Sequence, residues 1–410
     1  MSENKKLIPK RRFKEFENAD AWEQRELDIL ADFSKGSGYS KSDLVSTGEP
    51  VILYGRLYTN YETVIRDIDT FVNDISNSVL SKGGEVIVPS SGETAEDISR
   101  ASVVDSTGIA LGGDLNIIYP KAQIDSTFLA LTISNGNQKK ELSKRAQGKS
   151  VVHIRNEDLK KVLLVFPKKE EQKLIGRFFC SLDQTIAFQQ RKLEKMKSMK
   201  SAYLSEMFPA EGERKPKRRF PGFTDDWEQR ELGEVADVRD GTHDSPKFVD
   251  NGYPLVTSKN LTSGTLDLTD VSYLTQEDYD AINQRSRVDK GDILFAMIGT
   301  IGNPVIVENT GFAIKNVALI KEDKVPNKFL LQLLKSSVFE KYIKFENAGG
   351  TQKFLGLGTI RNFKFLSPSK EEAIQIADFF SNLDQTIAFQ QQKLEKLQNI
   401  KKAYLNEMFI

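Results

Sequence analysis

The chain has 410 residues, and its 58 basic residues balance 58 acidic ones to a formal net charge of zero. This length allows two independent cores, and the zero charge excludes nucleic-acid binding by bulk electrostatics alone, so any DNA contact must come from local clusters or partners. A single cysteine, Cys180, excludes an internal disulfide and a cysteine-based metal cluster. The N-terminal segment lacks an apolar signal region, and no apolar run is long enough to span a membrane, so we expect a cytoplasmic protein.

Each half of the chain begins with a basic and aromatic leader. Residues 11–13 read RRF and precede WEQREL at 22–27, while residues 218–220 read RRF and precede WEQREL at 227–232. The basic stretches at 5–14 and 214–219 suggest phosphate contacts, which position a protein on DNA without reading sequence. For the second leader a solvated linker is favoured, because residues 209–221 are charged and contain several prolines.

Between the leader and the predicted long helix, the two halves share only a few short segments of similar sequence. GEVIV at 84–88 corresponds to GDILF at 291–295, and FLALTIS at 128–134 corresponds to FLLQLLK at 329–335. Loops rich in small polar and basic residues connect these segments, and Arg, Lys, Asn and Gln suit the edges of guanine and adenine. If the chain reads DNA, as the resemblance described below implies, the candidate contacts are Tyr54, Arg56, Ser91, Thr94, Lys149, His243, Ser258, Lys259, Asn260, Thr300, Thr351, Gln352 and Lys353. For each of them a solvated or turn-forming role is the alternative.

Each half ends in a segment that predicts a long helix. Residues 178–208 and 379–409 share 22 identities in 31 aligned positions, and the stretches 170–208 and 371–409 contain no proline and only Gly176. Their apolar residues recur in the alternating four-three pattern of a coiled coil. The predicted seam is Leu182, Ile186, Gln189, Leu193, Met196, Lys200, Tyr203 and Met207 in the first helix, and Leu383, Ile387, Gln390, Leu394, Leu397, Lys401, Tyr404 and Met408 in the second.

The polar seam positions favour an antiparallel pair. A parallel pair would place Lys200 against Lys401, a like-charge contact with a desolvation cost. With Leu182 opposite Met408, each lysine instead meets a glutamine, Gln189 or Gln390. An antiparallel pair of near-identical helices has pseudo-two-fold symmetry. Apolar residues off or at the edge of the seam are either packed on the chain's own domains or dock two copies of one partner: Phe188, Leu204, Phe389 and Leu405.

Signals of catalysis are weak. The phosphate-binding pattern GxxxxGK[ST] is absent, and the nearest match to the Asn-Pro-Pro-aromatic motif of adenine methyltransferases, at residues 303–306, lacks the second proline and the aromatic. The two histidines, His153 and His243, with one distant cysteine do not supply a metal site. We therefore expect no catalytic residue, metal or cofactor in this chain.

The whole chain resembles the specificity subunit of type I restriction-modification systems. The resemblance lies in the leader and tryptophan that begin each half, the GDIL...GxIG segment at 291–302, the GGTQ turn at 349–352, the PxxE entry to each long helix, and the repeated LDQTI. It implies that each half is a target-recognition domain for one part of a bipartite DNA sequence. It also implies that the helices bind two methyltransferase subunits, and that restriction subunits join this core. S-adenosylmethionine, ATP and Mg²⁺ would then belong to the partners.

We therefore expect an α+β chain with two target-recognition domains of mixed strands and short helices, joined by two long antiparallel coiled-coil helices with pseudo-two-fold symmetry. The predicted parts are a first domain at 1–169, a central helix at 170–208, a second domain with its linker at 209–370 and a C-terminal helix at 371–410. The first half has QGKS at 147–150 where the second has GGTQ at 349–352, a divergence that two different half-sites would require. The alternatives are a coiled-coil scaffold that binds two proteins without DNA, and an autonomous enzyme.

Overall fold

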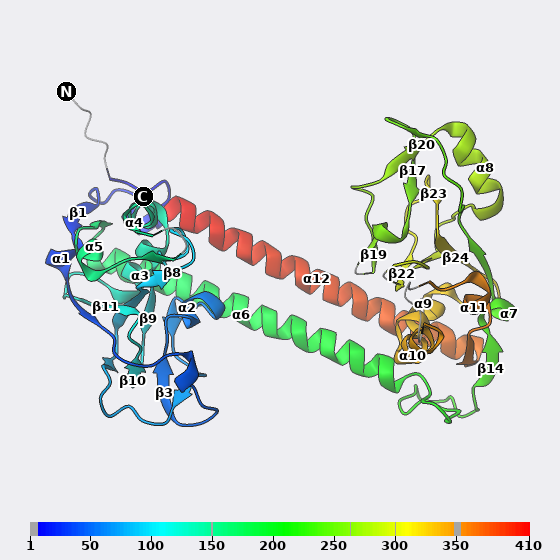
Figure 1. The fold of residues 1–410 in the computed structure, drawn as a ribbon, viewed down its shortest axis with the longest axis horizontal. Coiled ribbons are helices and arrows are strands. Elements are labelled where there is room, and N and C mark those ends of the chain that lie inside the picture. The colour runs from blue at the N-terminus through cyan, green and yellow to red at the C-terminus, as the bar shows by residue number, and fades with distance from the viewer. Residues whose placement is uncertain (1–6, 149–150, 263, 300, 348–353) are drawn as a thin grey trace. The chain divides into compact units, whose positions relative to one another are not determined.

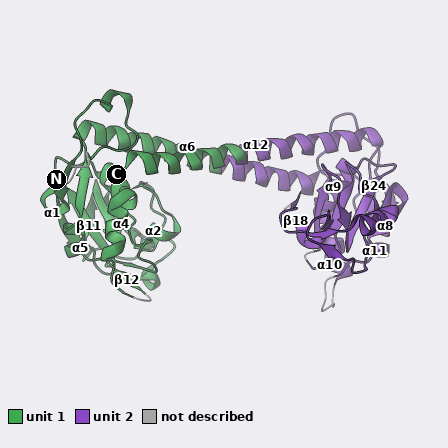
Figure 2. Ribbon diagram, turned by 90° about the horizontal axis from the view of Figure 1, so that it is seen from above, with its two compact units in different colours: residues 1–190, 392–410 green, residues 191–391 purple. Residues whose placement is uncertain are grey.

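The computed structural model describes residues 7–148, 151–262, 264–299, 301–347 and 354–410. Five candidate DNA contacts therefore lie outside the described residues: Lys149, Thr300, Thr351, Gln352 and Lys353. The chain forms two compact units, unit 1 of residues 1–190 and 392–410 and unit 2 of residues 191–391 (Figure 2). Each unit thus combines one globular domain with parts of both long helices. Within the described residues, no helix is long and apolar enough to cross a membrane.

Unit 1 is built on two sheets (Figure 1). The larger has the order β2-β11-β7-β9-β4 and is antiparallel except between β9 and β4, and the smaller has the order β5-β3-β10-β6 with β3 and β10 parallel. Two short ladders, β1-β13 and β12-β8, complete it. The strands are β1 (Glu23–Glu26), β2 (Ala31–Lys35), β3 (Glu49–Ile52), β4 (Val64–Ile65), β5 (Phe71–Val72), β6 (Leu80–Lys82), β7 (Glu85–Pro89), β8 (Ser91–Gly92), β9 (Ser102–Val104), β10 (Thr107–Leu111), β11 (Leu115–Pro120), β12 (Val152–His153) and β13 (Leu163–Phe166). The short helices are α1 (Leu27–Leu30), α2 (Arg56–Thr59), α3 (Ser126–Ser134), α4 (Gly136–Arg145) and α5 (Asn156–Lys160).

Unit 2 repeats this plan with different lengths. Its sheets have the orders β15-β24-β21-β22 and β16-β20-β17-β23, with β17 and β23 parallel, and its short ladders are β14-β25 and β18-β19. The strands are β14 (Glu228–Glu231), β15 (Ala236–Asp240), β16 (Phe248–Val249), β17 (Tyr253–Val256), β18 (Leu261–Thr262), β19 (Thr265–Leu266), β20 (Ser272–Leu274), β21 (Ile293–Ala296), β22 (Gly302–Ile306), β23 (Ala313–Ile314), β24 (Val317–Glu322) and β25 (Lys364–Ser367). The short helices are α7 (Leu232–Val235), α8 (Gln276–Ser286), α9 (Asn327–Lys335), α10 (Ser337–Glu346) and α11 (Leu357–Arg361).

The short segments of similar sequence in the two halves form equivalent elements of the two units. GEVIV forms β7 and GDILF forms β21, each a fully buried strand, while the two phenylalanine-leucine segments form α3 and α9. Asp125 caps α3, because its side chain accepts hydrogen bonds from the amides of Thr127 and Phe128. The two tryptophans pack at equivalent places, Trp22 edge-on to Phe128 and Trp227 edge-on to Phe329. The leaders and tails therefore enclose similar cores.

The long helices are α6 (Lys169–Glu206) and α12 (Lys370–Met408), within two residues of the predicted bounds. In unit 1 the ring of Phe178 lies 5.2 Å from that of Tyr404, and Asp183, further along α6, pairs with Lys401, earlier on α12. In unit 2 the ring of Tyr203 lies 5.1 Å from that of Phe379, and Lys200 pairs with Asp384. Within each unit the two helices therefore run antiparallel. The predicted α+β class with two long antiparallel helices is confirmed, and a two-fold axis between the units stays a prediction.

The predicted register of the pair is wrong. Lys401 Nζ lies 2.5 Å from Asp183 Oδ1, whereas Gln189 was its expected partner. Lys200 Nζ likewise lies 2.5 Å from Asp384 Oδ1, where Gln390 was expected. The shift is about two helical turns. The prediction assumed that each seam residue faces another seam residue. A half-buried ammonium is better compensated by a carboxylate that flanks the seam.

Candidate nucleic-acid interface

One arginine of each leader is buried in an ion pair with the start of a long helix. Arg12 donates from Nε and Nη2 to Glu171 on α6, at 2.9 and 2.6 Å, and Arg219 donates in the same way to Glu372 on α12, at 2.6 and 2.7 Å. At most 14% of any of these four side chains is exposed. These bidentate pairs fix the chain's path into each domain and leave neither guanidinium open to a phosphate.

The preceding arginine of each leader holds the end of the other long helix. Arg11 pairs with Glu407 and lies over the Tyr404 ring, with 5.1 Å from its guanidinium carbon to the ring centroid. Arg218 pairs with Glu206 and lies 5.2 Å from the centroid of Tyr203. Both earlier interpretations are therefore corrected for Arg12 and Arg219, which are neither phosphate contacts nor part of a solvated linker. Arg11 and Arg218 are held by the fold, but about half of each side chain is exposed, so a phosphate contact by these two stays a prediction. We call this repeated arrangement the leader clamp.

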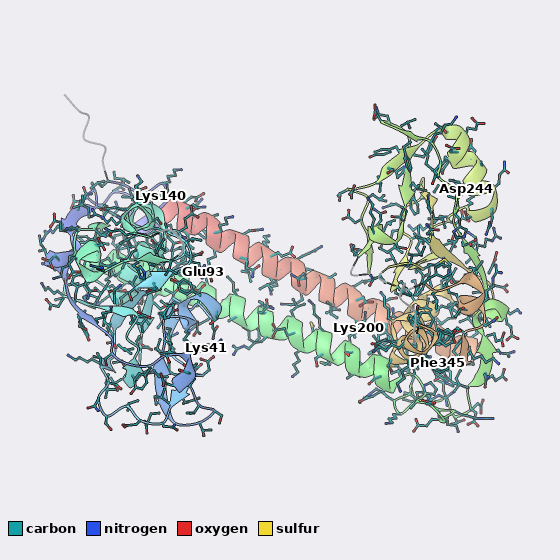
Figure 3. The ribbon with its side chains drawn as sticks, viewed as in Figure 1. Lys41, Glu93, Lys140, Lys200, Asp244 and Phe345 are labelled. Atoms are coloured by element: carbon teal, nitrogen blue, oxygen red, sulfur yellow. The ribbon has the colours of Figure 1, made fainter. Side chains whose placement is uncertain are left out.

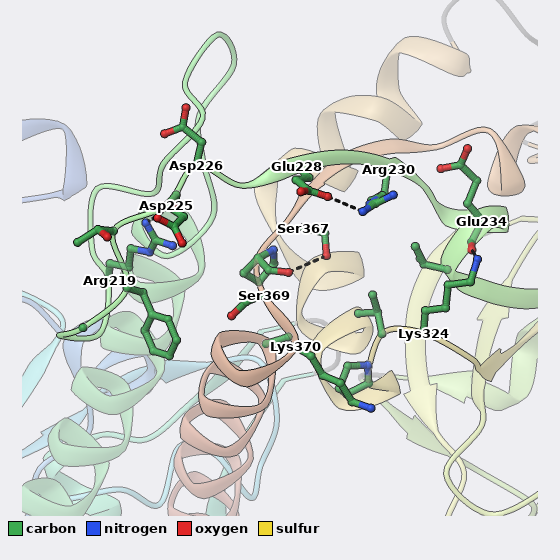
Figure 4. Close-up of a pocket in the computed structure, with 18 residues that line it drawn as sticks. Arg219, Asp225, Asp226, Glu228, Arg230, Glu234, Lys324, Ser367, Ser369 and Lys370 are labelled. Carbon is green, nitrogen blue, oxygen red and sulfur yellow. Dashed lines mark hydrogen bonds and ion pairs between the residues drawn. The ribbon is translucent and has the colours of Figure 1, made fainter.

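A polar cavity of about 670 Å³ lies beside the clamp of unit 2 (Figure 4). Side chains of both signs line it, and several already interact with one another or with the backbone: Arg230 pairs with Glu228, and Lys324 Nζ donates to the carbonyl oxygen of Glu234 at 2.8 Å. With its charges balanced, the cavity offers no net attraction for a phosphate.

Every predicted seam position is buried or half-buried on α6 and α12, including Leu193 and Leu394 at 2% exposure. Of the four candidate docking residues, Leu204 and Leu405 pack against the cores of unit 2 and unit 1, which is the alternative role considered for them. Phe188 and Phe389, by contrast, are 57% and 68% exposed. These two phenylalanines occupy the same repeat position, so they are the equivalent apolar surfaces that a twice-bound partner would need.

In the first domain, two candidates have structural roles. Arg56 is 7% exposed, pairs with Asp69 and Glu62 and donates to the carbonyl of Asp67. Thr94 accepts a hydrogen bond from the Asp97 amide at 3.0 Å, and its hydroxyl donates to the Asp97 carboxylate at 2.7 Å, which closes a turn. The contacts of Arg56 and Thr94 therefore fit the structural or turn-forming role that was the alternative to a DNA contact.

Ser91 lies on the β8-β12 ladder, and Tyr54 is connected to it through Tyr58. Ser91 is paired with His153 across this ladder, with 3.1 Å between Ser91 Oγ and His153 Nδ1, and Tyr58 Oη donates to the Ser91 carbonyl at 2.9 Å. Tyr54 packs edge-on against Tyr58, whose pKa is raised by burial, so that it remains a neutral donor. We call the Ser91–His153 pair the first edge. From the sequence, His153 was weighed only as a metal ligand, and its place at this edge was not predicted.

A cavity of about 590 Å³ adjoins the first edge. Ser91 and His153 line it together with Lys35, Asp114 and Arg155. Hydrogen-bond donors and acceptors are therefore grouped around a hollow, which suits a polar base edge better than an apolar one.

In the second domain, His243 and Ser258 meet at Asn316. His243 Nδ1 lies 2.7 Å from Asn316 Oδ1 and Nε2 lies 2.9 Å from Asp240 Oδ2, while Ser258 Oγ donates to the Asn316 carbonyl at 3.2 Å. Hydrogen bonding to Asp240 and then to Asn316 raises the pKa of His243, because both partners accept from the protonated ring. Asn316 has a left-handed backbone, with φ of 55°. Asn316 was not predicted from the sequence, although a lone Asn between two strand-like runs is a recognisable turn signal.

The neighbouring candidates are engaged within the domain. Asn260 is 3% exposed; its amide donates to the carbonyls of Asp267 and Asp270, and its Oδ1 accepts from the Thr257 amide. Lys259 forms an exposed ion pair with Asp270, at 2.9 Å. Exposed pairs of this kind contribute little and break easily. Lys259 therefore remains able to contact a phosphate, whereas Asn260 has a structural role.

The β21–β22 hairpin and the segment that begins at Phe354 lie side by side. Ile298 is bridged to Phe354 in antiparallel fashion, and the Leu355 amide donates to the Met297 carbonyl at 2.9 Å. We call the Ile298–Phe354 pair the second edge. Phe354 follows His153 by 201 positions, the period of the repeat, so the two edges occupy equivalent places. Ile298 and Phe354 were not predicted from the sequence, because the candidates were polar residues suited to base edges.

Among the described residues, no group of three or more His, Cys, Asp or Glu side chains could hold a metal ion. Cys180 lies on α6 and is half-buried, and burial raises the pKa of its thiol, which disfavours the reactive thiolate.

Comparisons with known proteins identify a family and relatives that this chain resembles. The family described as "Type I restriction modification DNA specificity domain" matches twice, at residues 19–198 and 224–399. The chain is 23% identical over 411 residues to the specificity subunit of the type I restriction enzyme MjaVIII of Methanocaldococcus jannaschii, covering 96% of this chain and 94% of that one. It is 27% identical over 198 residues to the putative MjaX specificity subunit of the same organism, covering 45% and 46%.

Solved structures agree on the fold. The S subunit of a type I restriction-modification system from M. genitalium superposes with a TM-score of 0.64 at 16% identity, covering 98% of this chain and 99% of that one. A chain from a study of complex assembly and conformational transition of the type I R-M system gives a TM-score of 0.54 at 16% identity, covering 95% and 97%. Because the family match spans most of both halves, the chain belongs to the family of type I restriction-modification DNA specificity proteins.

Proposed function

We propose that each domain of this specificity protein reads one half of a bipartite duplex DNA target, and that the long helices dock two copies of a methyltransferase subunit. The chain supplies recognition and assembly, and catalysis belongs to its partners. S-adenosylmethionine, ATP and Mg²⁺ would be bound by methyltransferase and restriction subunits, and the complex would act in the cytoplasm.

One observation carries this proposal: the two halves keep the same helices and clamps but present different edges. The arginine-glutamate pairs, the aspartate-lysine pairs and the exposed phenylalanines occur in both units at equivalent positions. The edges, in contrast, are Ser91–His153 in one unit and Ile298–Phe354 in the other. Identical surfaces suit two copies of one protein, and unlike surfaces suit two unlike DNA sequences.

Phe188 and Phe389 are the residues that we assign to methyltransferase docking. Burying such large, exposed apolar side chains beneath a partner is energetically favourable, and aromatic residues often contribute most of the binding energy of protein interfaces. Replacing both by alanine should weaken capture of the methyltransferase subunit. Alanine at Leu204 and Leu405 should instead lower the stability of the domains, because these residues pack against the two cores.

The experiment is methylome sequencing of a host that carries the intact system, followed by binding of the assembled complex to the duplex so identified. We expect a bipartite methylated motif with an unread gap, and loss of specific binding when either half is scrambled. A complex that assembles but binds scrambled and intact duplexes equally would favour the protein scaffold. Methyl transfer by the purified chain alone would favour the autonomous enzyme.

A further inference from the structure

The second edge presents two apolar side chains where the first presents a hydrogen-bonding pair. Ile298 is 39% exposed and Phe354 is 52% exposed, and as directly opposed residues of an antiparallel bridge they lie on the same face. A single exposed apolar residue is ordinary. Here two are paired in space although 56 positions separate them in sequence (354 minus 298).

The pair is anchored by its immediate neighbours. Met297 and Leu355 are each 1% exposed and are joined by the backbone hydrogen bond described above. Gly299, with φ of 76°, turns the chain directly after Ile298 in a conformation that other residues rarely adopt. Because both neighbours are buried, the two exposed side chains have a defined place on the domain, which favours discrimination between small chemical groups.

The repeat indicates what covers the second edge. A docking partner that binds both halves would require similar chemistry at equivalent positions, yet the equivalent residues in unit 1 are a serine and a histidine. The second edge therefore contacts a component that differs between the two domains. Under the proposed function this component is the DNA half-site. In the major groove, the apolar group that base pairs expose is the 5-methyl of thymine, and Phe and other apolar side chains are suited to contact it.

We propose that Ile298 and Phe354 together contact the 5-methyl group of a thymine in the half-site read by the second domain, and so determine specificity at that base pair. This inference rests on the proposed function. It adds two residues to the candidate readers and names the group that they recognise.

The test replaces each thymine of both half-sites, one at a time, by deoxyuridine, which lacks only the methyl group. The assembled complex is then bound to each duplex. Burial of one methyl-sized group contributes about 0.8 kcal/mol, so one substitution should weaken binding about fourfold. In a complex with Phe354→Ala this difference should be reduced, and in the double variant Ile298→Ala with Phe354→Ala it should fall to about onefold, while Phe354→Leu should retain most of it.

One control separates this effect from general damage. Phe345 (Figure 3) is 78% exposed in the same unit and lines a cavity together with Phe208 and Pro209, so Phe345→Ala should leave the deoxyuridine effect unchanged.

The outcomes are distinct. A half-site without thymine, no deoxyuridine effect at any position, or the same effect in Phe354→Ala would overturn the methyl contact while leaving bipartite recognition intact. Equal weakening by Phe354→Ala on thymine and uracil duplexes would indicate a wedge between base steps and would also overturn it. If the wild-type complex binds no bipartite sequence specifically, the proposed function itself fails.

Discussion

Replacing Arg219 by methionine is expected to destabilise unit 2 more than replacing its partner Glu372 by glutamine. The Glu372 side chain is completely buried, whereas 14% of the Arg219 side chain is exposed. Without Arg219, the Glu372 carboxylate loses its only ion-pair partner among the described residues and keeps the Trp227 Nε1 donor, at 3.1 Å. With glutamine at 372, Arg219 still donates to the Asp225 carbonyl at 2.7 Å and can be partly hydrated.

These differences set the expected magnitudes. Removing one partner of a buried ion pair costs about 3–5 kcal/mol, because the remaining charge is uncompensated, and this range applies to Arg219→Met. Glu372→Gln should cost about 1.5–3 kcal/mol, the value of a hydrogen bond to a charged group. The equivalent pair in unit 1 is the matched comparison. Arg12 and Glu171 are 4% and 1% exposed, and Arg12 also donates to the carbonyls of Ala19 and Asp20 at 3.0 and 3.2 Å, so Arg12→Met should likewise cost more than Glu171→Gln.

The assay is urea unfolding, monitored by tryptophan fluorescence. The chain has two tryptophans, one beside each clamp, so a Trp22→Phe background leaves Trp227 as the reporter for unit 2. Trp22 Nε1 is buried without a hydrogen-bond partner among the described residues, so this replacement removes an unsatisfied donor. Equal costs for the two changes in unit 2, or a larger cost for Glu372→Gln, would refute the reasoning from burial.

Three further predictions concern pH, recognition and assembly. The pKa of His243 lies above its ordinary value of 6.5, so the protonated ring stabilises unit 2 fully below that value, and this contribution is lost as pH rises through the raised pKa; an NMR titration midpoint at or below 6.5 would contradict this. Gln352→Ala or Lys353→Ala should weaken or relax one half-site by about 1–3 kcal/mol if either contacts a base well, and unchanged methylation specificity and rate in both would exclude that loop. Leu193→Asp buries a charge at a position that is 2% exposed, so it should weaken partner assembly and both half-sites together; an effect on one half-site alone in methylome sequencing would disprove a shared spacer.

Features that depend on local periodicity were predictable from the sequence. The bounds of α6 and α12 and the buried face of each follow from the spacing of apolar residues and the absence of helix breakers. The correspondence of 128–134 with 329–335, which form α3 and α9, follows from aligning the two copies of the repeat. The repeat itself predicted two similar units, since near-identical tails and tryptophan leaders require similar surroundings. These properties reside in neighbouring residues, so no knowledge of the tertiary fold was needed.

Other features were decided only by the tertiary structure, because they depend on which distant residues face one another. Arg12 and Glu171 are 159 positions apart, and nothing local distinguishes a buried ion pair from two solvated charges. Lys401 met Asp183 and not Gln189 because the register of two helices depends on their packing within a unit as well as on the seam pattern. The edges are the same kind of feature: Ser91 with His153, and Ile298 with Phe354, become neighbours only when strands from separate parts of the chain pair.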